Sequence, residues 1–95
     1  THYTVGHVGD GNFHVAYLVD PTVPSERETA EVLNVAVVHR ALRAQGTCSG
    51  EHGIGLHKQE FLVEEAGELA VEMMRTIKRA LDPKNIMNPG KIFSL

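Results

Sequence analysis

The sequence predicts an α+β domain in which an antiparallel β-hairpin packs with two amphipathic helices. Strand-forming residues flank an Asp-Gly pair near the start of the chain, which is a strong short-range hairpin signal. Further along, apolar residues recur at helical spacing in two separate stretches, which indicates two helices with one buried face each. With 95 residues, 42% of them hydrophobic, the chain is long enough for one small domain with a modest core.

The hairpin is expected to comprise residues 2–8 and 12–19, with Asp10 and Gly11 at the tip of the turn. This register places His7 directly opposite His14 on one face, with Cβ atoms roughly 4.5–5.5 Å apart. Two imidazoles at that separation suit a shared metal ion. The alternative interpretation is an ordinary cross-strand pair of polar side chains.

The first helix is expected to begin after Pro24, where Ser25 and Glu28 have the spacing of a capping box. It should end near residue 45, with Gly46 as its stop. Its predicted buried face consists of Ala30, Leu33, Val37, Ala41 and Leu42.

The second helix is expected over residues 63–81, with a buried stripe formed by Leu69, Met73, Ile77 and Leu81. A tight turn or a single helical turn is predicted to start at residues 82–83, and a second turn is predicted at residues 88–91. Two strands make a very small sheet. We therefore expect further strands from a missing part of the chain or from a second subunit, and we expect the chain to form a homo-oligomer through its open edges.

Composition narrows the function classes. A net charge of −3 argues against a nucleic-acid partner, which would favour a basic surface. No apolar run is long enough for a transmembrane helix. A single cysteine, Cys48, excludes an internal disulfide, and we expect it to be a small buried or loop residue rather than a nucleophile. The chain starts in strand-like sequence without a methionine, so we expect it to be a piece of a longer protein.

A second unusual stretch, residues 46–55, holds four glycines around Glu51 and His52. Glu51 together with His7 and His14 would make a site of two histidines and one carboxylate, which suits catalytic Zn²⁺, Mn²⁺ or Fe²⁺. His52 lies beside this ligand set and is a candidate general base near neutral pH. A helix-capping role for Glu51 and a surface role for His52 are the alternatives.

Three stretches occur together in this order: GHVGDGNFH at residues 6–14, GEHGIG at residues 50–55, and DPKNIMNPGK at residues 82–91. In combination they resemble the C-terminal domain of FAD-linked oxidases of the vanillyl-alcohol-oxidase type. Within that group the chain is most similar to FAD-dependent D-lactate dehydrogenases, with glycolate oxidase D-subunits and D-2-hydroxyglutarate dehydrogenases as close relatives.

The resemblance implies an N-terminal FAD-binding domain followed by this cap domain, an antiparallel sheet flanked by helices that covers the flavin and binds substrate. It implies that His7, His14 and Glu51 bind a divalent metal, Zn, Mn or Fe, and that His52 accepts the hydroxyl proton of the substrate. It also implies that Asn12 lies near the substrate, while Asn88 and Lys91 lie close to the flavin.

The activity implied is oxidation of a D-2-hydroxy acid, such as lactate or glycolate, to the 2-oxo acid, with electrons passed through FAD to a quinone or cytochrome. The expected location is the cytoplasm, a membrane surface, or the mitochondrion in a eukaryote. The FAD domain is absent from residues 1–95, so we expect this chain alone to be inactive and to bind no FAD. The alternatives are a stand-alone metal-binding or interaction module without redox activity, and a purely structural remnant without a metal.

Overall fold

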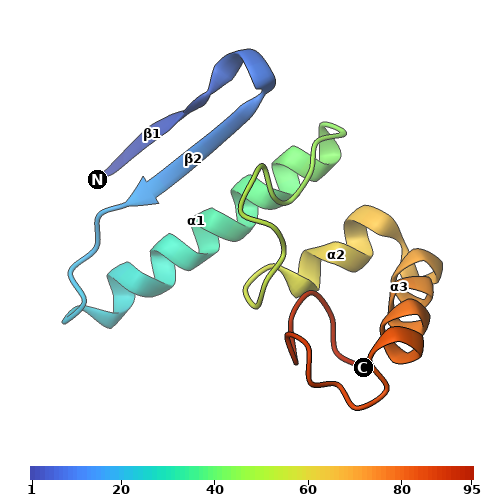
Figure 1. The fold of residues 1–95 in the computed structure, drawn as a ribbon. Coiled ribbons are helices and arrows are strands. Elements are labelled where there is room, and N and C mark those ends of the chain that lie inside the picture. Colours follow the sequence, from blue (N-terminus) through green and yellow to red (C-terminus); the bar gives the residue numbers. More distant parts are fainter. The chain divides into compact units, whose positions relative to one another are not determined.

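The computed structural model describes all of the residues Thr1–Leu95 and confirms the α+β fold class (Figure 1). Two strands are followed by three helices rather than the two predicted. The chain forms two compact units, Thr1–Gln45 and Gly46–Leu95. No helix has the length and apolar character needed to cross a membrane.

The first unit begins with a hairpin of strand β1 (His2–His7) and strand β2 (Asn12–Tyr17), paired antiparallel. Gly6 pairs with Phe13, and a Cβ at Gly6 would collide with the backbone of residues 12 and 13. Glycine is therefore required here for the two backbones to approach each other.

The predicted two-residue turn at Asp10 and Gly11 is wrong. A short 3-10 turn, η1 (Val8–Asp10), ends at Gly11, whose φ is 71°, and the Gly11 amide donates to the Val8 carbonyl at 3.1 Å. A two-residue turn of the predicted kind needs positive φ at both central residues, and of the two only Gly11 adopts it. The chain therefore uses a four-residue loop, and His7 pairs with Asn12 instead of His14.

Helix α1 (Pro24–Arg43) begins differently from the prediction. Pro24 occupies the first turn, where its missing N–H costs nothing, and no side chain caps the helix. The proposed capping box of Ser25 and Glu28 is therefore wrong. Glu26 instead accepts a hydrogen bond from the Asp20 amide at 2.8 Å, which secures the segment that leads into the helix.

The predicted buried face of α1 is confirmed only in part, because Leu33 is exposed and its other four members are half-buried. The buried side chain of the helix is Val38, which was not predicted. At the other end, Gln45 rather than Gly46 takes the left-handed conformation, with φ of 62°. The end of β2 and the first half of α1 line a hollow of about 450 Å³. This hollow contains none of the predicted site residues.

The second unit contains helix α2 (Gln59–Ala66) and helix α3 (Glu68–Leu81), where the sequence predicts a single helix. Gly67 separates them with φ of 82° and ψ of 152°, a conformation essentially restricted to glycine. The C-terminal segment folds back beside the start of α2 (Figure 1), because the Ile92 amide donates to the Gly55 carbonyl at 2.8 Å.

The predicted buried stripe of α3 is also wrong. Its four members are all exposed, from 53% for Ile77 to 89% for Leu69. The buried face instead carries Val71, which is 1% exposed, together with half-buried Met74, Arg75 and Lys78. The break at Gly67 gives α3 a direction independent of α2, so the stripe of strongest apolar periodicity is not the one that packs.

We therefore predict opposite outcomes for two truncations in α3. Val71→Ala should lower the free energy of unfolding by about 2 kcal/mol, because it removes buried methyl groups and leaves a cavity. Leu69→Ala, the matched control, should change it by less than about 0.5 kcal/mol, because that side chain is already solvated. Urea denaturation measures both, and an equal loss for Leu69→Ala would contradict the observed orientation of α3.

Candidate active site

Three of the predicted site residues lie on one face of the hairpin. His7 pairs with Asn12 and His14 pairs with Val5, so the two histidines are diagonal neighbours rather than directly opposed. Because side chains alternate along a strand, His7, Asn12 and His14 share one face. The register differs from the predicted one by two residues, and a shift of two preserves the face. Diagonal neighbours lie roughly 7–8 Å apart.

Asn12 is directly opposite one imidazole and two residues from the other. Asn12 and His14 are half-buried, whereas His7 is exposed at the end of β1. An amide between two imidazoles can hydrogen-bond a polar ligand held at the same face. The hairpin thus groups the predicted substrate-binding residue with two of the three predicted metal ligands.

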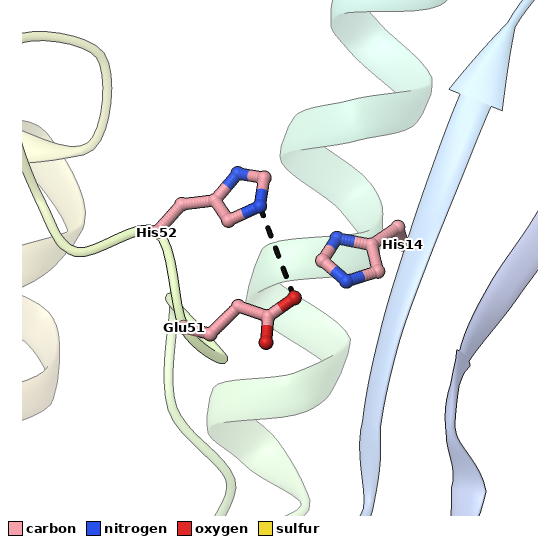
Figure 2. A group of neighbouring side chains, drawn as sticks. All are labelled: His14, Glu51 and His52. Carbon is pink, nitrogen blue, oxygen red and sulfur yellow. Dashed lines mark ion pairs between the residues drawn. The ribbon is translucent and has the colours of Figure 1, made fainter.

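Glu51 and His52 lie in the second unit, in residues 48–55, which we call the Glu51–His52 loop. The two side chains point toward each other (Figure 2), with Glu51 Oε1 3.9 Å from His52 Nε2. The side chains are 46% and 74% exposed, respectively. Gly53 and Gly55 adopt positive φ of 74° and 54°, which keeps this segment out of any helix. Glu51 therefore caps no helix, contrary to the alternative interpretation.

The Glu51–His52 loop borders a hollow of about 350 Å³, lined also by Glu65 of α2. Thr47 donates from its hydroxyl to the Ser49 carbonyl at 2.7 Å. The Ser49 hydroxyl oxygen is buried without a hydrogen-bond partner, a condition that costs about 1–3 kcal/mol. The loop therefore includes one polar atom whose burial is not compensated within the chain.

Cys48, at the start of the loop, is 4% exposed. Burial, with a further contribution from hydrogen bonding to Glu65, raises the pKa of the Cys48 thiol to about 11. The thiol is therefore protonated at neutral pH, and a protonated buried thiol is a poor nucleophile. This agrees with the prediction that Cys48 is a buried or loop residue.

Asn88 and Lys91 lie together in one turn near the C-terminus. The Lys91 amide donates to the Asn88 carbonyl at 3.3 Å, and Asn88 has φ of 47°. Both side chains are exposed. Gln59 joins this turn to the Glu51–His52 loop, because its side-chain amide donates to the Gly90 carbonyl at 2.7 Å and to the Gly55 carbonyl at 3.2 Å.

Asp82 has a structural role that the sequence analysis missed. Its side chain is 5% exposed and accepts hydrogen bonds from the amides of Ile86 and Met87, at 3.0 and 2.8 Å, and from the Lys78 ammonium. These interactions, with Lys78 the largest, lower the pKa of Asp82 from its ordinary 3.8 to about 2. The spacing of Lys78 and Asp82, four residues apart at a helix end, was the available signal.

The family to which this chain belongs follows from a comparison with known proteins. A family described as "FAD linked oxidases, C-terminal domain" matches residues 1–92. The chain belongs to the FAD-linked oxidases. The predicted resemblance is therefore confirmed at the level of the family.

Individual members of the FAD-linked oxidases refine this result. The chain is 60% identical over 89 residues to D-lactate dehydrogenase (cytochrome) 1, mitochondrial, of Saccharomyces cerevisiae, which covers 94% of this chain and 15% of the relative. It is 37% identical to glycolate oxidase subunit GlcD of Bacillus subtilis, over 96% of this chain and 19% of that protein. The chain is 34% identical to D-2-hydroxyglutarate dehydrogenase of Stutzerimonas stutzeri, over 94% of this chain and 20% of that protein. The chain thus spans a fifth or less of the length of these relatives.

The roles predicted for individual residues of this family member stay predictions. His7, Asn12 and His14 belong to the first unit, whereas Glu51, His52, Asn88 and Lys91 belong to the second. Sequence analysis also overlooked Gln59 and Glu65, whose hydrogen bonds hold the Glu51–His52 loop.

We predict that Asp82→Asn lowers the thermal unfolding midpoint at pH 7 by several degrees, because the variant loses the ion pair with Lys78. The folded-state pKa is depressed, so the stabilising effect of Asp82 is fully present above about pH 4 and is lost as pH falls toward 2. The difference between wild type and variant should therefore shrink over that range.

Calorimetry at a series of pH values measures this difference. Asp10→Asn, at an exposed position, is the control and should leave the midpoint unchanged. A gap between Asp82→Asn and wild type that stays constant from pH 7 to pH 2 would show that the carboxylate charge contributes nothing.

Proposed function

We propose that this chain is the cap and substrate domain, residues 1–95, of a flavin-dependent dehydrogenase that oxidises a D-2-hydroxy acid to the 2-oxo acid. One observation carries the proposal: within a chain of the FAD-linked oxidase family, the hairpin sets two imidazoles and an amide on a single face. D-Lactate is the substrate we favour, since identity to a D-lactate dehydrogenase is 60%, compared with 37% to a glycolate oxidase subunit.

The proposed metal ligands are His7, His14 and Glu51. Two imidazoles and one carboxylate form a donor set suited to Zn²⁺, Mn²⁺ or Fe²⁺ with open positions for substrate. The hollow of about 350 Å³ that Glu51 lines supports a bound group at this loop. When bound, a divalent ion would polarise the substrate hydroxyl, and FAD would accept the hydride.

The residues of the chain account for the remaining chemistry. His52 accepts the hydroxyl proton at a ring nitrogen, and the carboxylate of Glu51, 3.9 Å away, stabilises the imidazolium that results. Asn12, on the same hairpin face as the histidines, hydrogen-bonds the substrate carboxylate and orients it. Asn88 and Lys91 are proposed to lie at the flavin, with Lys91 supplying positive charge there.

The proposal extends to partners. FAD would be held mainly by a segment outside residues 1–95, and a cytochrome is the electron acceptor we favour because the name of the yeast relative includes one. That name also includes the word "mitochondrial", and we propose the mitochondrion as the location of this protein. No further strand pairs with either edge of the hairpin, and unpaired edges are templates for pairing, so we also propose self-association of the chain.

Metal binding gives a direct prediction. His7→Ala or His14→Ala should weaken Mn²⁺ or Zn²⁺ binding by more than the roughly 10–100-fold loss typical of outer-shell changes, because each removes one of three protein ligands. His2→Ala is the matched control, since His2 lies on β1 but on the opposite face from His7. Isothermal titration with each metal is the measurement. Unchanged affinity in both variants would exclude the hairpin as a metal site and favour a structural role.

The base assignment gives a second prediction. In a flavin-loaded enzyme that carries this chain, His52→Ala should lower turnover of D-lactate about 10²–10⁴-fold, the range for a positioned acid–base group. Flavin content should stay normal. His57→Ala, an exposed histidine five residues away, should retain turnover. A wild-type enzyme that binds metal but leaves its flavin oxidised with every 2-hydroxy acid would favour a metal-binding module without redox activity.

A further inference from the structure

A single carboxylate on α2 holds the upstream end of the Glu51–His52 loop. The Cys48 amide donates to Glu65 Oε2 at 2.8 Å, across 17 residues of sequence. The same carboxylate also contributes to the raised pKa of the Cys48 thiol. Hydrogen bonds to an ionised acceptor are stronger than neutral ones, so Glu65 is a firm anchor for residue 48, three positions before Glu51.

The position of Glu65 in its own helix gives independent support. Glu65 lies in the last turn of α2 (Gln59–Ala66), where a negative charge is disfavoured by the helix dipole. The helix itself therefore gains nothing from this carboxylate. The hydrogen bond from the Cys48 amide is a favourable interaction that offsets this cost.

The downstream end of the loop is held from the same helix. Gln59 donates to the Gly55 carbonyl at 3.2 Å, and the Ile92 amide donates to the same carbonyl at 2.8 Å. Gln59 and Glu65 stand at the two ends of α2, six residues apart, and each contacts one end of the loop. The hollow that Glu65 lines is the one that Glu51 also lines.

Between these two ends the loop carries two glycines, Gly50 and Gly53, on either side of the functional pair. Glu51 and His52 are exposed and flanked by glycine, and glycine restricts the backbone least of all residues. The positions of the two ends of the loop therefore contribute to the placement of the carboxylate and the imidazole.

We propose that Glu65 and Gln59 are positioning residues, which fix the ends of the Glu51–His52 loop so that its carboxylate and imidazole are presented together for the reaction. The proposal rests on the function proposed above for Glu51 and His52. Neither Glu65 nor Gln59 needs to touch substrate, since each acts through the backbone of the loop.

The test compares three variants of a flavin-loaded enzyme that carries this chain. Glu65→Ala removes the anchor, Glu65→Gln keeps an oxygen that can accept the Cys48 amide, and Glu60→Ala removes an exposed glutamate from the first turn of the same helix. Each is assayed for turnover of D-lactate, for flavin content, for thermal midpoint, and for the alkylation rate of Cys48 by iodoacetamide, read by mass spectrometry of the peptide that contains it.

Glu65→Ala should lower kcat about 10–100-fold, the cost of a small misplacement of a reacting group, with a much smaller change in KM. Cys48 should be alkylated at least about tenfold faster, because the backbone at residue 48 loses its anchor and the thiol loses the neighbouring carboxylate that helps to raise its pKa. Glu65→Gln should restore most of the turnover, and Glu60→Ala should match wild type in every assay. Gln59→Ala should lower kcat in the same way without faster alkylation of Cys48.

Faster alkylation of Cys48 in Glu65→Ala with wild-type kcat would overturn the positioning role, since the anchor would be lost without consequence for the reaction. Wild-type alkylation and wild-type kcat together would overturn the anchor itself, as would a Glu65→Gln variant no better than Glu65→Ala. A wild-type enzyme without turnover would defeat the proposed function instead, and the alkylation rates would still decide the anchor.

Discussion

The loops of the second unit are held in place by hydrogen bonds between their backbone and the side chains of α2. Its buried apolar side chains are few: Cys48, Phe61, Leu62 and Val71. A glycine-rich segment offers almost no side-chain surface to such a core, so packing alone cannot hold it. Gln59 instead joins two backbone carbonyls, at Gly55 and Gly90. That one amide connects the two motifs of the second unit that carry family resemblance.

Asp82 supports the same arrangement from the end of α3. By binding the amides of residues 86 and 87, its carboxylate sets the direction in which the chain leaves the helix and enters the turn of Asn88 and Lys91. A nearly buried carboxylate is tolerated here because Lys78 and two amides satisfy it. The buried charged residue Asp82 thus orients a loop. Such a role is expected in a small domain, because its core is limited.

The fold class, both strands and the motif residues could be predicted from sequence, because alternation, turn residues and short signatures are local properties. The register of the hairpin could not, since an Asp-Gly pair is compatible with both a two-residue and a four-residue loop. The buried face of α3 could not be predicted from the apolar pattern either. Gly67 separates this helix from α2, and apolar periodicity identifies an apolar stripe without showing whether another element covers it. The contacts of Glu65 with Cys48 and of Gln59 with Gly90 span 17 and 31 residues, and nothing in the immediate sequence of Gln59 or Glu65 marks either residue as an anchor.

The burial of Cys48 and the raised pKa of its thiol affect how readily this domain is oxidised. Oxidation of cysteine to sulfenic acid and beyond proceeds through the thiolate and requires access of the oxidant. With a pKa of about 11 and 4% exposure, the thiol presents almost no thiolate at neutral pH and little surface to peroxide. A loop that bears a proposed catalytic histidine can therefore include a sulfur atom without becoming the first position to be oxidised.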